Sequence, residues 1–417
     1  MTRQKPFAIP KQLVWEAYQR VKANRGGCGI DRVSLEAFEE RLQDNLYKIW
    51  NRMSSGSYHP PAVRRVEIPK SGGGTRPLGI PTVGDRIAQM VVKLTLEPVL
   101  EPRFHPCSYG YRPGRSALDA VEACRQHCWR YDWVIDMDIK GFFDAIDHEL
   151  MMRAVGKHAT ERWQALYIER WLKAPVVHAD GRTEPRTRGT PQGGVISPLL
   201  ANLFLHYAFD RWMQVSWPGI RFERYADDAV CHCRTRGEAE RLLKALGQRL
   251  DDCGLTLHPS KTKIVYCRDG ARRGTWGQTQ FTFLGYRFRC RTTRSCHGTI
   301  FQGFNPAMEP AAARRVRQTI RERTDRRQCC KSVREVVDDL NPVIRGVWAY
   351  YGRFCPSEVQ RLVGAFIDRR LQHWARRKYK RMRDSWRIAG RWVRRLRRTS
   401  PGLLAHWQPS ARMGRAV

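Results

Sequence analysis

Two adjacent carboxylates mark the first place where this chain could do chemistry. Asp227 and Asp228 stand between apolar residues in the segment RYADDAVCHC. Apolar runs on both sides of a short polar pair predict a tight β-hairpin with the carboxylates at its tip. An Asp-Asp turn is usually only a solvated turn, but neighbouring carboxylates in a partly buried tip repel each other unless a cation neutralises them. The pair therefore predicts a divalent-metal site.

A second acidic segment, DWVIDMDIKGFFD, supplies further carboxylates. Strand alternation with a period of two puts Val134, Asp136 and Asp138 on one face. On geometry alone, Asp136 and Asp138 are both candidates. Carboxylates from this segment and from the hairpin tip could together hold two Mg²⁺ ions about 3.5–4 Å apart, the arrangement that stabilises the attacking and leaving oxygens in phosphoryl transfer.

The overall charge indicates a polyanionic partner. The 417 residues include 75 Lys and Arg against 40 acidic residues, a formal net charge of +35. The surplus is uneven, because residues 309–417 hold 28 basic and nine acidic residues, a net charge of +19. Such a concentration is typical of a surface that binds a phosphate backbone, so nucleic acid is the predicted partner.

Neither membrane insertion nor a disulfide framework is predicted. No apolar run approaches the roughly 18 residues that a membrane span needs, and the N-terminus lacks the layout of a secretory signal, so we expect a cytoplasmic protein. The thirteen cysteines are irregularly spaced and include no CxxC pair. The clusters at 231–233 and 290–297 look like metal ligands, but structural zinc usually requires C-x2-4-C spacing with a second matching pair. We therefore predict that the cysteines are reduced, partly buried thiols.

The acidic segments need a scaffold, and residue periodicity predicts a mixture of helices and strands. Residues 11–60, 83–100 and 116–130 have helical periodicity. Residues 62–81 alternate around SGGG and predict two strands joined by a flexible turn. After residue 305 strand signals fade, and an apolar helical stripe with arginines largely outside it predicts a basic helical domain. The predicted fold class is α+β.

A series of motifs in order resembles the group II intron reverse transcriptases, also called maturases, from about residue 11 to 380. The motifs are KSGGGTRPLGIPT (70–82), SYGYRPGRSA (108–117), DMDIKGFFDAIDH (136–148), RGTPQGGVISPLLANLFLH (188–206), RYADD (224–228), GLTLHPSKTK (254–263), FTFLGY (281–286) and NPVIRGVWAYYGRF (341–354). The last motif, followed by RRKYKR, resembles the maturase domain. The resemblance implies an RNA-directed DNA polymerase with the right-hand architecture of fingers, palm and thumb.

The resemblance also implies how the chain is divided. We expect a helical N-terminal extension at 1–60, fingers and palm at 61–300, a helical thumb and maturase domain at 301–385 and a basic C-terminal tail at 386–417. Some relatives carry a DNA-cutting domain with paired His and Cys ligands, and no such cluster follows Arg381. We therefore expect no endonuclease domain and no nicking of double-stranded DNA by the protein alone.

The same resemblance implies roles for individual residues. Asp138, Asp227 and Asp228 match the catalytic aspartates that bind metal, which leaves Asp136 as a structural or indirect residue. The residues expected at the incoming nucleotide are Lys70, Arg76, Phe143, Gln192 and Gly193. The residues expected to contact nucleic acid are Arg115, Lys261, Arg345, Arg376, Arg377 and Lys378.

Some of these residues have an ordinary structural alternative. Phe143 resembles the aromatic gate that excludes a 2′-hydroxyl, and its alternative is a core aromatic. Lys70 and Arg76 resemble the pair that holds the triphosphate, where cations meet developing negative charge; their alternative is an exposed hairpin. Arg115 resembles a residue that contacts the template, and its alternative is a structural ion pair.

The implied cofactors are two Mg²⁺ ions, with Mn²⁺ as a substitute. The implied partners are an RNA template with a DNA primer, deoxynucleoside triphosphates, target DNA and the group II intron RNA that the protein helps to splice. Two alternatives remain at this point. One is a splicing cofactor with a vestigial polymerase site, against which the intact site residues argue; the other is an intron-free polymerase in host defence or repair.

Overall fold

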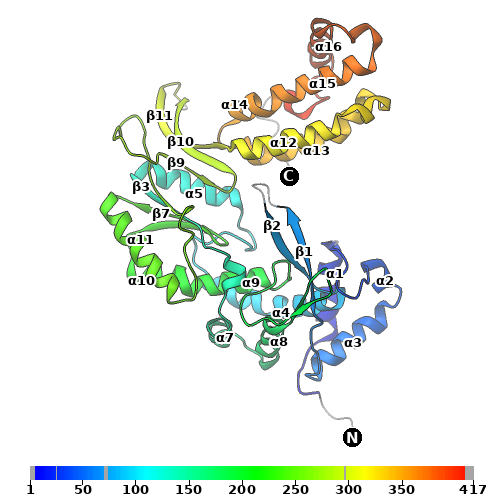
Figure 1. Ribbon diagram of the computed structural model, residues 1–417, viewed down its shortest axis with the longest axis vertical. Coiled ribbons are helices and arrows are strands. Elements are labelled where there is room, and N and C mark those ends of the chain that lie inside the picture. The colour runs from blue at the N-terminus through cyan, green and yellow to red at the C-terminus, as the bar shows by residue number, and fades with distance from the viewer. Residues whose placement is uncertain (1–4, 25, 70–73, 295–296, 409–417) are drawn as a thin grey trace. The chain divides into compact units, whose positions relative to one another are not determined.

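The structure is a computed structural model that describes residues 5–24, 26–69, 74–294 and 297–408 (Figure 1). The chain forms two compact units. The first comprises Met1–Ala120 and Met137–Lys263, and the second comprises Val121–Asp136 and Ile264–Val417. Both units contain helices and strands, which confirms the predicted α+β class.

The first unit contains most of the helices expected for the N-terminal half. Its elements are α1 (Lys11–Ala23), α2 (Leu35–Glu39), α3 (Leu42–Ser54), β1 (Val63–Pro69), β2 (Thr75–Ile80), α4 (Val83–Leu100), α6 (Phe142–Ala145), α7 (His148–Gly156), α8 (Arg162–Lys173), β4 (Val176–Val177), β5 (Thr183–Glu184), α9 (Ser197–Leu205), a π-helical turn (His206–Asp210), α10 (Arg211–Ser216), β6 (Arg221–Tyr225), β7 (Asp228–Cys233) and α11 (Arg236–Asp251).

Helix α4 organises the core of this unit, because it packs against α1, α3, α8 and α9. The Thr82 side chain caps it by accepting a hydrogen bond from the amide of Asp85. Asp85 is buried and accepts hydrogen bonds from Tyr58 Oη and Trp171 Nε1, both at 2.7 Å. Burial raises the pKa of Asp85 to about 6. These bonds tie α4 to α8 and to the segment before β1.

The predicted strand pair at 62–81 is confirmed. Strands β1 and β2 pair in antiparallel fashion from Arg64↔Ile80 to Pro69↔Thr75. The short strands β4 and β5 extend this sheet in the order β2-β1-β4-β5. The connecting turn at 70–73, which includes Lys70, lies outside the described residues.

The second unit combines a small sheet with a helical domain. Its elements are most of α5 (Ala117–Arg130), β3 (Trp133–Met137), β8 (Lys263–Tyr266), β9 (Gln280–Phe283), β10 (Tyr286–Arg294), β11 (Ile300–Met308), α12 (Pro310–Arg323), α13 (Val333–Tyr351), α14 (Pro356–Val359), α15 (Ala365–Lys378) and α16 (Trp386–Thr399). Strands β9, β10 and β11 form an antiparallel sheet in which the rings of Phe281 and Phe288 stack at 4.7 Å.

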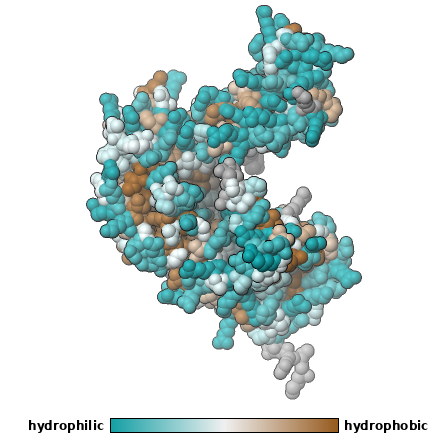
Figure 2. Space-filling model, viewed as in Figure 1, coloured by the Kyte–Doolittle hydropathy of each residue, from teal (hydrophilic) through white to brown (hydrophobic). Residues whose placement is uncertain are grey.

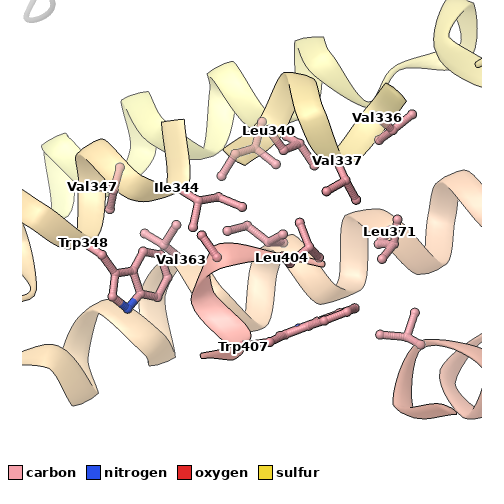
Figure 3. Close-up of a cluster of buried hydrophobic side chains, with 14 of the residues drawn as sticks. Val336, Val337, Leu340, Ile344, Val347, Trp348, Val363, Leu371, Leu404 and Trp407 are labelled. Carbon is pink, nitrogen blue, oxygen red and sulfur yellow. The ribbon is translucent and has the colours of Figure 1, made fainter. Parts of the chain in front are cut away.

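Helices α12 to α16 enclose a separate hydrophobic core. Val336, Leu340 and Ile344 of α13 point toward α15, where Leu371 lies (Figure 3). The capping box between Ser332 and Glu335 begins α13. Outside this core, hydrophilic residues cover most of the visible face of these helices (Figure 2).

The segment predicted as a basic tail is folded as far as residue 408. Residues 386–399 form α16, and a 3₁₀ turn follows at Ala405–Trp407. Leu404 and Trp407 are buried in the helical core (Figure 3), and Val393 of α16 is buried in the same core. Apolar contacts therefore outweigh the repulsion between the arginines. Among the described residues, no helix is both long enough and apolar enough to cross a bilayer.

Candidate active site

The predicted acidic hairpin is confirmed. Strands β6 and β7 pair from Arg221↔His232 to Tyr225↔Asp228, which leaves only Ala226 and Asp227 in the turn. Ala226 has φ of 57° and is buried, an uncommon combination for a residue with a side chain. The hairpin therefore presents Asp227 and Asp228 side by side in a conformation that the surrounding residues must hold in place.

Asp138 joins this pair from a separate segment of the first unit. It follows the last residue of β3, and its carbonyl accepts a hydrogen bond from the amide of His258 at 2.8 Å. Its carboxylate forms an ion pair with Lys261, with 2.7 Å between Oδ2 and Nζ. Asp138 is close enough to raise the pKa of both Asp227 and Asp228 by charge repulsion.

The electrostatics of the three carboxylates fit a divalent cation. Desolvation, and then repulsion from Asp227 and Asp138, raises the pKa of Asp228 to about 7, while Lys261 lowers it. Desolvation also raises the pKa of Asp227. Carboxylate oxygens are hard ligands, and Mg²⁺ or Mn²⁺ bound among them stabilises their ionised form against mutual repulsion. Asp138, Asp227 and Asp228 are thus the residues that would hold metal.

Metal binding at this cluster is expected to depend on pH. Because Asp228 must lose its proton to ligate a cation, the apparent affinity for Mn²⁺ should fall about tenfold per pH unit below about 7 and level off above it. Without metal, Asp228 is protonated up to about pH 7 in the folded state but only up to about pH 3.8 in the unfolded state. Between these two pH values the folded state therefore binds more protons, and the free energy of unfolding falls as the pH rises.

Titration of Mn²⁺ by electron paramagnetic resonance, at pH values from about 6 to about 8, measures this dependence. Asp251→Asn is the matched control, because Asp251 is an exposed acid at the end of α11. The control should leave the pH profile unchanged. A Mn²⁺ affinity that does not vary with pH in the unaltered protein would contradict the assignment of Asp228 as a ligand.

The residues predicted at the nucleotide come together in part. Arg76 Nε donates to Gln192 Oε1 at 2.5 Å, although these residues lie in β2 and in a distant loop. Gly193 has φ of 111°, and a Cβ there would lie 2.6 Å from the carbonyl oxygen of Gly79. Only glycine therefore allows this loop to pack on β2. Gln192 also lines a cavity of about 340 Å³.

Phe143 adjoins the same loop. It lies on the short helix α6 and is 6% exposed, and its carbonyl accepts a hydrogen bond from the amide of Thr190 at 2.8 Å. Its ring packs against that of Phe142 at 5.4 Å. Phe143 is thus a buried aromatic that also borders the loop carrying Gln192.

The residues predicted to contact nucleic acid in the first unit have different surroundings. Arg115 is exposed and stacks 5.8 Å from the centroid of the Tyr109 ring, and it donates to the carbonyl of Pro106. Its neighbour Arg112, which is buried, forms an ion pair with the partly exposed Glu101. Lys261 forms an ion pair with Asp138, so it lies at the acidic cluster itself.

The corresponding residues of the second unit also divide into two kinds. Arg345 and Arg377 are exposed on α13 and α15. Arg376 donates to the carbonyl of Arg383 and lies 4.1 Å from the centroid of the Trp386 ring. Lys378 donates to the carbonyls of Cys329 and Lys331. Within the part of the chain that the structure describes, Arg345 and Arg377 make no hydrogen bond or ion pair that ties helices together. Arg376 and Lys378, in contrast, stabilise the helical fold through their bonds to backbone carbonyls.

The cysteine cluster at 231–233 has the surroundings of a structural core. Cys231 and Cys233 are buried free thiols, and burial raises the pKa of Cys233 to about 12. His232 forms a buried pair with Glu223, with 2.6 Å between Nε2 and Oε2. A thiol with a raised pKa is a poor metal ligand. Cys296 of the second cluster lies outside the described residues.

Two residues near the hairpin were missed by the sequence analysis. Arg224 is fully buried beside the tip, and its position next to the acidic motif was the available signal. Tyr111 has φ of 58° and is 48% exposed. Desolvation, and then the charge of Asp227, raises its pKa. No pattern in the sequence indicates that Tyr111 has a positive φ or that it lies near the carboxylates.

Comparisons with known proteins agree with this geometry. The family described as reverse transcriptase (RNA-dependent DNA polymerase) matches residues 68–288, and the group II intron, maturase-specific domain matches residues 313–392. The chain is 33% identical to the protein YkfC of Escherichia coli (strain K12), over 64% of this chain and 77% of that protein. It is 34% identical to the group II intron-encoded protein LtrA of Lactococcus lactis subsp. cremoris, over 55% of this chain and 38% of that protein.

A solved structure of telomerase from Candida albicans with a fragment of telomeric RNA aligns with a TM-score of 0.46 and 12% identity. The alignment covers 89% of this chain and 65% of that chain.

The family match over residues 68–288 includes the hairpin, Asp138 and the loop at Gln192, and it covers more than half of the chain. The chain therefore belongs to the reverse transcriptases, the right-hand polymerases that copy RNA into DNA and depend on divalent metal. The maturase-specific domain follows in the same chain. The protein is accordingly a reverse transcriptase and maturase of the group II intron type.

Proposed function

We propose that Asp138, Asp227 and Asp228 bind two Mg²⁺ ions, for which Mn²⁺ can substitute, and that this site joins a deoxynucleoside triphosphate to a DNA primer on an RNA template. The observation that carries the proposal is the convergence of three carboxylates, where desolvation and then repulsion from Asp227 and Asp138 raise the pKa of Asp228 to about 7. When bound, the metal ions stabilise the attacking and leaving oxygens of phosphoryl transfer.

The protein's own residues position the nucleotide. Arg76 and Gln192, which are joined by a hydrogen bond, would bind the triphosphate and the base or sugar, with Lys70 as a second cation. A guanidinium near the leaving pyrophosphate stabilises the charge that develops there. Phe143 would exclude a ribose 2′-hydroxyl by its bulk, because it borders the loop of Gln192 through Thr190.

Sugar choice tests this function directly. On an RNA template with a DNA primer, the unaltered protein should extend with deoxynucleotides and discriminate against ribonucleotides. Phe143→Ala should reduce that discrimination by about tenfold to a hundredfold, since a steric pocket loses its selectivity when the blocking group is removed. Primer extension with each nucleotide class gives the ratio of kcat/KM values.

The ratio is measured within one variant, so a general loss of folded protein cancels. Phe143→Tyr is the matched control, because it keeps the ring and should keep the discrimination. An active Phe143→Ala variant with an unchanged ratio would show that Phe143 is only a core residue. Absence of any extension by the unaltered protein would contradict the proposed polymerase reaction.

The intron RNA and the target DNA are the further proposed partners. Structured RNA is recognised through shape, phosphates and 2′-hydroxyls. The helical domain supports this role, since its exposed arginines include Arg345, Arg377 and six on α16. A broad basic surface suits such recognition better than a short motif that reads bases.

A further inference from the structure

A buried arginine lies directly behind the catalytic hairpin. Arg224 and Asp210 are both 0% exposed and form a two-pronged ion pair. The distances are 2.7 Å from Nε to Oδ1 and 2.6 Å from Nη2 to Oδ2. Burial of two charges costs desolvation energy that an apolar pair would avoid, so stability alone is a weak explanation for this pair.

The remaining arm of the guanidinium reaches the turn itself. Arg224 Nη1 donates to the carbonyl of Ala226 at 3.0 Å and to Asn202 Oδ1 at 3.0 Å. Ala226 is the residue with φ of 57° that immediately precedes the two carboxylates. A strained backbone persists only where surrounding contacts determine it. The Arg224 side chain supplies such a contact.

A second set of bonds closes the network on the other side of the hairpin. The amide of Arg224 donates to the carbonyl of Cys107, and the carbonyl of Arg224 accepts from the amide of Tyr109. Asn202 Nδ2 donates to the carbonyl of Gly110 at 2.6 Å. A Cβ on Gly110 would lie 2.4 Å from the amide nitrogen of Ala226, so backbone packs directly on the turn.

The position of Asp210 depends on an irregularity in the helix. Residues His206–Asp210 form a π-helical turn between α9 and α10. A π-turn rotates the residues that follow it relative to a regular α-helix, and such turns often occur at functional sites. Asn202 of α9 and Asp210 of the π-turn thereby both face Arg224.

We propose that Arg224 is a positioning residue that fixes the hairpin turn, and with it the metal-binding geometry of Asp227 and Asp228, through Asp210 and Asn202. This inference rests on the proposed role of the two aspartates. The planar fork of arginine satisfies Asp210, Asn202 and the Ala226 carbonyl at once, which the single ammonium of lysine does not.

Two variants test the network from different sides. Arg224→Lys keeps the charge and loses the planar guanidinium. Asn202→Ala keeps the ion pair between Arg224 and Asp210 and removes the bonds of Asn202 to Arg224 and Gly110. Both should weaken Mn²⁺ binding, measured by electron paramagnetic resonance without substrate, by about tenfold to a hundredfold. The half-activating Mg²⁺ concentration should rise in parallel and kcat should fall, while the KM for deoxynucleotide and the affinity for primer–template stay within about twofold.

Glu223→Gln is the matched control, because Glu223 lies in the same hairpin and its pair with His232 is equally buried. The control should lower the thermal midpoint and leave Mn²⁺ affinity unchanged. If Arg224→Lys fails to fold, Asn202→Ala decides the question.

The inference is overturned if the folded variants lose thermal stability as the control does but retain Mn²⁺ affinity and the half-activating Mg²⁺ concentration. A different failure would concern the proposed function: a double Asp227→Ala, Asp228→Ala variant that still extends a primer would remove the site itself. The two failures are therefore distinguishable.

Discussion

Replacement of Asp138, Asp227 or Asp228 with Ala is expected to reduce RNA-templated DNA synthesis by about a thousandfold or more, since each removes a proposed ligand of the metal ions that stabilise charge on the reacting phosphate. Affinity for RNA should stay within a few fold, because binding energy comes mainly from the basic surface. Primer extension and filter binding on the same preparations measure the two effects separately.

Asp251→Ala is the control for the loss of a negative charge, since Asp251 is exposed in the same unit. This control should retain synthesis. The three site variants should fold at least as stably as the unaltered protein in metal-free solution near neutral pH, because each relieves repulsion within the cluster. Primer extension by the double Asp227→Ala, Asp228→Ala variant would contradict the assignment.

The second large effect is expected from helix α16. Its exposed arginines include a dense run, Arg391, Arg394, Arg395, Arg397 and Arg398. Their replacement with Gln should weaken binding to structured RNA by about a hundredfold at roughly 0.1 M salt. The slope of log affinity against log salt should fall by about one for each arginine that contacts a phosphate. Filter binding over a series of salt concentrations measures both quantities.

Gln preserves helix propensity, so α16 should remain folded on its buried residue Val393. A control variant replaces Arg234, Arg241 and Lys244, which are exposed in the first unit, and the two slopes are compared per charge removed. An unchanged slope in the α16 variant would mean that these arginines are solvated and make no dedicated contact with RNA.

Local patterns were enough to predict the acidic hairpin. A hairpin depends on residues that are neighbours in the chain, so RYADD between apolar runs already predicted a tight hairpin with Asp227 and Asp228 at its tip. The structure adds the strand ends, at Tyr225 and Asp228. Helix α4 and the stripe of Val359, Val363, Ile367 and Leu371 were predictable for the same reason, since helical periodicity lies within a few turns.

Alternation alone did not decide between Asp136 and Asp138. Alternation puts both residues on one face of the predicted strand, and only the family resemblance favours Asp138 as the metal ligand. In the structure β3 ends at Met137, so Asp138 follows the strand and meets Lys261. Where a strand ends depends on its neighbours in the sheet as well as on its own residues.

The contacts that complete the site were decided only by tertiary structure. The bond from Arg76 to Gln192 joins residues 116 positions apart, and the network of Arg224 joins a hairpin, a π-turn and the segment at Cys107–Gly110. Lys378 belongs to a basic run, yet it donates to backbone carbonyls. Composition and periodicity describe a residue and its neighbours in the chain. A buried charge must be paired or hydrogen-bonded, and its partners come from elements that are distant in the chain. The packing of those elements therefore decides which groups pair with it.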